Sequence, residues 1–288
     1  MKGVEAAEII GDLASQQWGL VTSAQAKESG IDLPSLSRLE QRGMFARIRH
    51  GVYASAAIAQ SAVLELQAQW LALRPELMAA DRINNPQLAA EAIVSHTTAA
   101  EMWGIGDLWP DGFHFTVRRR RRSRQIDVQF HRADLADSDW TVHPQSGLPI
   151  TTVARTIYDL AQDGHEPEHL LALISDAGNK FLLDKQELID VFSGFEDAFG
   201  ASKGDRQEFD ALVKDYFPEV NDVKHINFRI EEALRPLQTQ IAALMARLGT
   251  LAMVDLVVPP SIECQPRELQ QTKLRGGIDR SEEKAFND

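Results

Sequence analysis

Side chains of the kinds that read DNA bases follow one another between residues 35 and 42. Arginine can donate to both acceptors of guanine, glutamine can pair with adenine, and serine tolerates a base or a phosphate. In a predicted helix over 35–42, Leu36 and Leu39 are three residues apart, so both should face a core. The exposed side of that helix would carry the candidate DNA-binding residues Ser35, Ser37, Arg38, Gln41 and Arg42.

A basic hairpin is predicted directly after this helix. Segment 45–53 places apolar and basic side chains around a His-Gly pair, which is typical of a small β-hairpin. From Ser35 to Tyr53, four arginines oppose only Glu40, so the local net charge is +3 in a chain whose net charge is −12. We therefore expect local contacts with nucleic acid. The candidate DNA-binding residues of the hairpin are Arg47, Arg49 and His50.

A second basic feature is a run of six arginines within the seven residues 118–124. The like charges repel one another, and phosphates would neutralise them with release of counterions. We favour contact with the DNA backbone; an acidic protein partner and a merely solvated turn are the alternatives. The candidate residues of this run are Arg118, Arg119, Arg120, Arg121, Arg122 and Arg124.

No group of residues in the sequence strongly indicates a catalytic site. Ser95 and His96 are adjacent, but no oriented acid or glycine-rich elbow accompanies them, so we interpret His96 as a core or capping residue. The histidines are scattered along the chain; only His165 and His169 are four apart, at a polar helix start. The single cysteine, Cys264, excludes an internal disulfide. We expect no cofactor, no metal site and no enzymatic activity.

A degenerate nuclease site is the one enzymatic alternative. Asp255 and Glu263 loosely imitate the acidic pair of metal-dependent nucleases, but Gln265 stands where such a site has a lysine. Without that positive charge, the developing negative charge on the phosphate would lack a stabilising group. An ordinary strand followed by a capping acid explains the same residues.

The elements that position the basic residues follow from helical spacing and chain breaks. Helices are predicted over 5–18, 22–28 and 35–42, with Gly19, Ser29-Gly30 and Gly43 as breaks. Three short helices followed at once by a hairpin is the order of a winged helix-turn-helix. In that fold the third helix enters the major groove and the wing touches the adjacent backbone.

The rest of the chain predicts an α+β protein. We expect strands at 113–117, 125–130 and 140–142. Helices are expected after 150–152 and at 59–77, 168–176, 185–192, 208–217 and 226–248. An apolar run follows at 251–258. The apolar stripe of 226–248 favours an intramolecular core, with a dimer or toxin-facing surface as the alternative. The predicted domains are a winged helix-turn-helix (1–56), a linker helix (57–86), a mixed α/β domain (87–165), a mostly helical C-terminal region (166–260) and a polar tail (261–288).

Composition points to a cytoplasmic protein. Hydrophobic residues make up 44% and charged residues 25%, and no apolar run approaches the roughly 20 residues of a membrane span. Acidic residues at the start argue against a signal peptide. The net charge is −2 over residues 1–159 and −10 over residues 160–288, so the acidity is mostly C-terminal.

Three further segments are informative together: 43–53, 94–100 and 147–161. In their order and spacing they resemble the AbiEi-like antitoxins of abortive-infection, type IV toxin–antitoxin systems. The resemblance implies a winged-helix DNA-binding domain, a C-terminal domain needed for antitoxicity, and repression of the protein's own operon through inverted repeats in the promoter. It also implies double-stranded DNA and a nucleotidyltransferase-like toxin as partners. A solitary winged-helix regulator and, less favoured, a nuclease remain the alternatives.

Overall fold

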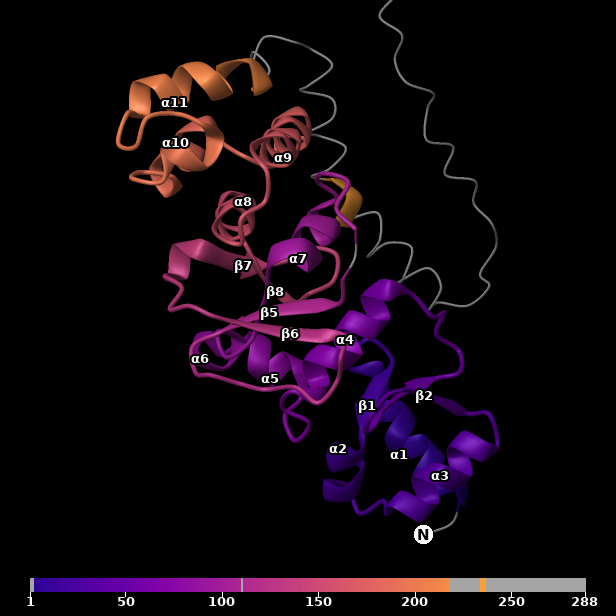
Figure 1. The fold of residues 1–288 in the computed structure, drawn as a ribbon. Coiled ribbons are helices and arrows are strands. Elements are labelled where there is room, and N and C mark those ends of the chain that lie inside the picture. Colours follow the sequence, from indigo (N-terminus) through magenta and orange to yellow (C-terminus); the bar gives the residue numbers. More distant parts are fainter. Residues whose placement is uncertain (1–2, 110, 218–233, 237–288) are drawn as a thin grey trace, which may run out of the picture. The chain divides into compact units, whose positions relative to one another are not determined.

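The structure is a computed structural model, which describes residues 3–109, 111–217 and 234–236 (Figure 1). All of them belong to one compact unit, Met1–Ile241. It contains helices and two β-sheets, so the predicted α+β class is confirmed. Within these described ranges, no helix is both long and apolar enough to cross a membrane.

The N-terminal region combines three helices with a three-stranded antiparallel sheet in the order β1-β3-β2. Its elements are α1 (Gly3–Ser15), β1 (Leu20–Thr22), α2 (Ser23–Glu28), α3 (Leu33–Gln41), β2 (Phe45–Arg49) and β3 (Val52–Ser55). The predicted hairpin is the β2-β3 pair. Strand β1 was not predicted, because three residues show no periodicity; it forms through pairing of Leu20 with Ala54 and Val21 with Tyr53.

Side-chain caps determine where α2 and α3 begin. The Thr22 hydroxyl accepts a hydrogen bond from the Gln25 amide at 3.1 Å, and Gln25 Oε1 accepts one from the Thr22 amide at 3.0 Å. Asp32 Oδ1 likewise accepts from the Ser35 amide at 2.9 Å. Because each cap satisfies amides that a helix start leaves unpaired, local sequence alone directs the turn between the two helices.

The predicted helix at 59–77 is shorter and more buried than expected. Helix α4 (Ala62–Ala72) begins after the Ser61 cap. It ends shortly before Pro75, because a proline disfavours helical backbone at the preceding residue. Trp70 is fully buried, and its indole donates to the Ala92 carbonyl at 2.9 Å. One hydrophobic cluster joins α4 to Leu20 of β1 and to strands of the second sheet, so this helix is a core element. Short helices α5 (Ala79–Ile83) and α6 (Pro86–Ala89) follow.

The second sheet has five strands in the order β6-β5-β4-β8-β7. Its elements and the helices beside it are β4 (Ile93–Val94), α7 (His96–Trp103), β5 (Phe113–Val117), β6 (Val128–Arg132), η1 (Asp137–Asp139), β7 (Trp140–Val142), β8 (Pro149–Thr151) and α8 (Val153–Gln162). Pairs β5-β6 and β4-β8 are parallel, and the other pairs are antiparallel. The strand predicted at 125–130 begins later, at Val128, because residues 118–127 must carry the chain back for parallel pairing. Strand β8 was predicted only as a lead-in to α8.

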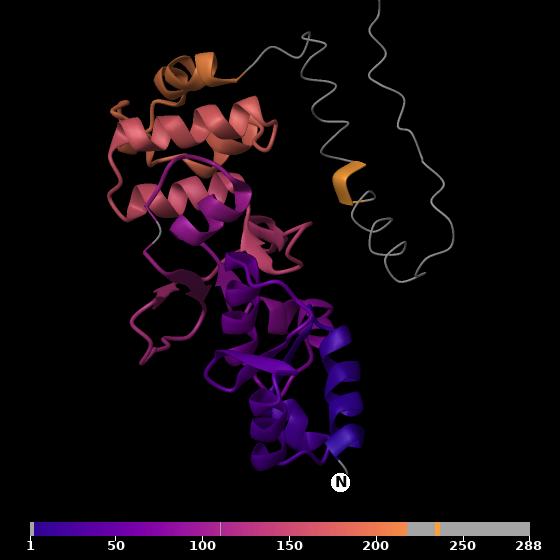
Figure 2. The ribbon, with the colours of Figure 1, turned by 90° about the vertical axis from the view of Figure 1, so that its right-hand side faces the viewer.

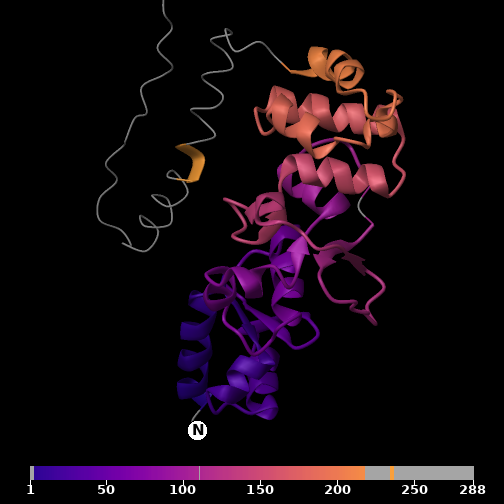
Figure 3. The ribbon, with the colours of Figure 1, turned by 90° about the vertical axis from the view of Figure 1, so that its left-hand side faces the viewer.

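Among the remaining described helices, α9 and α10 pack on α8, and the others pack in turn on α9 and α10 (Figures 2 and 3). They are α9 (Pro167–Asn179), α10 (Lys185–Val191), η2 (Glu196–Phe199), α11 (Arg206–Val213) and η3 (Lys214–Tyr216), close to the predicted helices at 168–176, 185–192 and 208–217. A single hydrophobic cluster runs from Ile157 of α8 through Leu173 and Phe192 to Phe209, so it crosses the predicted boundary at residue 165.

Several predictions fall outside the described residues. They are the helix at 226–248 apart from the helical residues 234–236, the apolar run at 251–258 with Asp255, the nearby Glu263, and the polar tail at 261–288.

Candidate nucleic-acid interface

Helix α3 has one buried and one exposed side. Leu36 and Leu39 are 1% and 2% exposed, and they pack in a cluster with Phe45 and Tyr53 of the hairpin. The shared cluster holds helix and hairpin together. On the other side Arg38, Gln41 and Arg42 are exposed, whereas Ser35 and Ser37 are half-buried. The buried side is the one that the leucine spacing predicted.

Arg38 lies along its own helix. Its Nε atom donates to the Pro34 carbonyl at 3.2 Å, one turn earlier. This bond occupies one donor of the guanidinium, and its two terminal nitrogens remain available for a pair of acceptors on a base edge.

The hairpin ends in a tight turn that carries two of the predicted residues. Gly51 has a φ of +74°, a left-handed conformation that glycine adopts without steric cost. Arg47 and His50 are exposed, and Arg47 Nη2 lies 2.7 Å from His50 Nδ1. Since the guanidinium can only donate, His50 Nδ1 is the acceptor in this contact. Arg47 places a positive charge at the hairpin end.

Arg49 has different surroundings, because its side chain is only 15% exposed. Its Nη1 donates to Asp127 Oδ2, and its Nη2 lies 3.9 Å from Glu65 Oε2. The guanidinium also lies 4.7 Å from the centre of the Phe113 ring, a cation–π distance. Two carboxylates therefore already balance its charge, unlike that of Arg47.

The arginine run lies in the loop 118–127 that connects the parallel strands β5 and β6. Two of its members have partners: the exposed Arg118 pairs with Asp134 at 3.2 Å, and Nη2 of the half-buried Arg121 donates to the Leu73 carbonyl at 2.6 Å. The other four are also exposed: Arg119, Arg120, Arg122 and Arg124. The loop borders a pocket of about 450 Å³ lined by Arg74, Gln87, Glu91, Val117 and Arg118 to Arg121.

The last residue of the loop contacts the hairpin through the Arg49–Asp127 pair. The candidate residues thus form two groups. One comprises α3 and the hairpin, and the other is the arginine loop on the second sheet.

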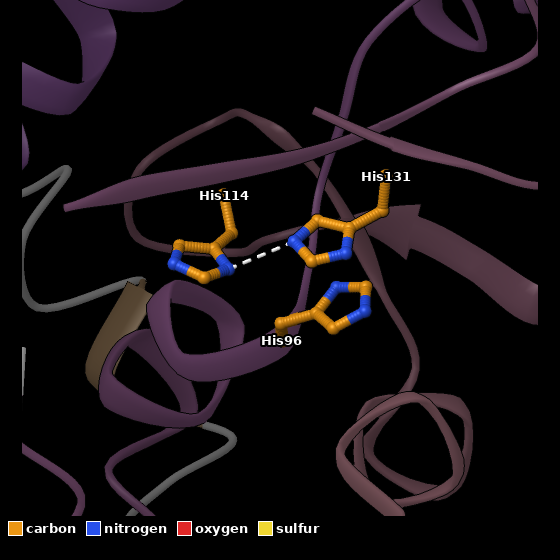
Figure 4. A group of neighbouring side chains, drawn as sticks. All are labelled: His96, His114 and His131. Atoms are coloured by element: carbon orange, nitrogen blue, oxygen red, sulfur yellow. Dashed lines mark hydrogen bonds between the residues drawn. The ribbon is translucent and has the colours of Figure 1, made fainter. Parts of the chain in front are cut away.

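Sequence reasoning missed a group of three histidines, which it treated as scattered. The structure brings His96, His114 and His131 together (Figure 4). The rings of His96 and His131 stack with centres 3.5 Å apart, and His131 Nε2 lies 3.0 Å from His114 Nδ1. The sequence holds one signal for this group. Apolar and polar residues alternate within 113–117 and 128–132, which puts His114 and His131 on the polar face of their strands.

Comparison with known proteins finds a family match in the N-terminal region. Residues 8–56 match the family model described as a transcriptional regulator, AbiEi antitoxin. Among solved structures, the chain is similar to the crystal structure of the RV2827C protein from Mycobacterium tuberculosis. That match has a TM-score of 0.45 and 18% identity, and it covers 75% of this chain and 83% of that one. No curated protein sequence matches the chain. Residues 8–56, with their buried leucine core and exposed basic helix, are therefore similar to the AbiEi family of antitoxin transcriptional regulators.

Proposed function

We propose that the chain is a DNA-binding antitoxin that represses its own toxin–antitoxin operon by binding inverted repeats in the promoter. In this proposal it acts in the cytoplasm and counteracts a nucleotidyltransferase-like toxin. The observation that carries the proposal is the exposed side of α3, with Arg38, Gln41 and Arg42, within a segment that matches an antitoxin regulator family.

The order of elements supports a winged helix-turn-helix as the DNA-binding unit. Helices α2 and α3 are joined by a tight turn, and the β2-β3 hairpin follows directly. In such a unit α3 is the recognition helix and the hairpin is the wing. Arg38, Gln41 and Arg42 would contact base edges, while Arg47 would contact a phosphate.

Binding without catalysis accounts for these residues. The whole chain has a net charge of −12, so contact with DNA must be limited to the basic helix, the hairpin and the arginine loop. In the loop, the exposed Arg119, Arg120, Arg122 and Arg124 can neutralise further phosphates of the same DNA.

The decisive experiment is a gel shift of the purified full chain on the DNA upstream of its own gene. A scrambled duplex of equal length is the control, and each titration is made at roughly 50 and 200 mM salt. We expect tighter binding to the upstream DNA than to the scrambled duplex by at least about 10³-fold, and weaker binding to both at high salt. Equal affinity for the two duplexes would contradict the proposal.

A second experiment separates an antitoxin from a solitary regulator. The neighbouring gene is expressed in cells with and without this chain, and growth is measured. Growth arrest that the chain relieves supports the antitoxin role. Harmless expression of the neighbour, combined with specific DNA binding, favours the solitary regulator.

A further inference from the structure

The second sheet has one apolar and one polar face near β5 and β6. Phe115 and Phe130 face the α4 core, with ring centres 6.2 Å apart. Successive residues of a strand point to opposite faces, so His114 and Thr116 lie on the other side of β5. Thr116 is paired with His131 across the two strands, which places both histidines on this polar face.

The third histidine reaches the same face from a different element. His96 is the first residue of α7 and is 5% exposed. Its backbone φ is +54°, a left-handed conformation that side-chain-bearing residues rarely adopt. With this backbone its ring lies flat against that of His131, at an interplanar angle of 18°. Outliers of this kind concentrate at functional sites, where the surrounding structure maintains them.

The three rings offer a compact set of nitrogen atoms (Figure 4). One ring nitrogen from each histidine lies within 4.8 Å of the other two, and His114 Nδ1 and His131 Nε2 are 3.0 Å apart. In a tetrahedral site with metal–nitrogen bonds of about 2.1 Å, ligand nitrogens are about 3.4 Å apart. The nitrogen separations in the structure, from 3.0 Å to at most 4.8 Å, bracket this value.

Oxygen atoms surround the rings as outer partners of metal ligands commonly do. Asp111 Oδ1 lies 2.8 Å from His114 Nε2, which leaves Nδ1 of that ring for the ion, and Ser95 Oγ lies 2.9 Å from His96 Nδ1. Asp163 Oδ2 is 3.6 Å from His96 Nε2 and 3.8 Å from His131 Nδ1. Asp163 is 43% exposed, so the group has a carboxylate on its solvent side.

The rings lie largely out of solvent. His96 and His114 are 5% and 4% exposed, and the side chain of His131 is 23% exposed. Such an enclosed setting limits the access of water to a bound ion.

We propose that His96, His114 and His131 form a binding site for a single Zn²⁺ ion, with Asp111 as an outer partner. Zinc suits three imidazole ligands in tetrahedral geometry, with the fourth position open to water or to Asp163. The site uses none of the residues assigned to DNA binding, so it goes beyond the proposed function.

The test uses the full chain without a histidine tag, after removal of metals with a chelator. Zn²⁺ is titrated calorimetrically, and Co²⁺ is added separately as a spectroscopic probe. We expect one equivalent of Zn²⁺ and the intense visible absorption of tetrahedral Co²⁺, which Zn²⁺ then displaces. Gel shifts on the same samples report DNA binding independently.

Three variants locate the site. His114→Gln and His131→Gln should each lose more affinity than the roughly 10–100-fold expected for Asp111→Asn, because ligands contribute more than outer partners. His143→Gln is the matched control, since His143 is also buried but lies outside the group, and it should bind normally.

Two results would overturn the proposal. One is the absence of stoichiometric Zn²⁺ binding by the wild-type chain, which is decisive even if a variant fails to fold. The other is unchanged affinity in folded His114→Gln and His131→Gln proteins, which would place the ion elsewhere in the chain.

Discussion

Arg49 and Asp127 form an ion pair across 78 residues of sequence. Arg49 ends the outer strand of the N-terminal hairpin, and Asp127 ends the arginine loop just before β6. The pair therefore connects the two groups of candidate DNA-binding residues. It also distinguishes Arg49 from Arg47, which lies two residues earlier and is exposed.

Because of this difference, substitution of Arg49 should affect stability, whereas substitution of Arg47 should affect DNA affinity. Arg49→Ala should lower the free energy of unfolding by about 1–2 kcal/mol, because it removes a charge-assisted hydrogen bond from a mostly buried side chain. Arg47→Ala should leave stability unchanged and weaken binding to all DNA sequences. Urea unfolding and gel shifts measure the two effects. Equal stability of both variants would contradict a structural role for Arg49.

Exposed residues of α3 should determine sequence preference. Replacing Arg38 and Arg42 together by alanine is expected to reduce the preference for upstream over scrambled DNA at least about tenfold, since each good base contact contributes roughly 1–3 kcal/mol of discrimination. Competition gel shifts measure this ratio. Lys203→Ala, which removes an exposed positive charge far along the chain, is the control. A preference equal to that of the wild type would remove α3 from base recognition.

The arginine loop should contribute to affinity without contributing to sequence preference. Replacing the exposed Arg119, Arg120 and Arg122 by alanine is expected to reduce the slope of log affinity against log salt by about 0.9 for each phosphate that the loop no longer neutralises. Fluorescence anisotropy over a series of salt concentrations measures the slope.

Arg121→Ala provides the comparison within the same loop. Its guanidinium is bound to the Leu73 carbonyl, so the substitution should lower stability more than it changes the salt slope. An unchanged slope in the triple variant would favour an acidic protein partner or a solvated turn for this loop.

His143 should make the folded protein sensitive to acid. Burial lowers the pKa of His143 below its usual value of 6.5, and its Nδ1 accepts a hydrogen bond from the Ser146 amide at 3.2 Å. Below pH 6.5 the unfolded chain takes up a proton that the folded chain excludes, so stability falls as the pH falls.

The size of this effect can be isolated with His143→Gln. Between pH 7.5 and 5.5, His143 should contribute a loss of up to about 1.4 kcal/mol that the variant lacks. Urea unfolding of both proteins at the two pH values gives the difference. Identical pH dependence in wild type and variant would show that His143 does not titrate between the two states.

Local sequence was sufficient for the elements that begin and end within a few residues. The caps at Thr22 and Asp32, the leucine spacing of α3 and the turn at Gly51 depend on neighbours in the chain, so helices α2 and α3 and the hairpin were predicted. The exposed basic side of α3 could also be predicted from local sequence, because helical periodicity alone separates its residues from Leu36 and Leu39.

Long-range pairing decided the rest. Strands β1 and β8 are three residues long and exist because partners elsewhere in the chain bond to them, and the burial of α4 follows from the two sheets around it. Arg49 looks like a free cation in the sequence, yet a distant carboxylate balances its charge. The three histidines are separated by 18 or 17 residues and meet only because β5 and β6 pair in parallel beside α7. Composition, caps and spacing therefore determined the N-terminal DNA-binding candidate. Only tertiary structure could decide which charges remain free and which histidines meet, because both depend on groups far apart in the chain.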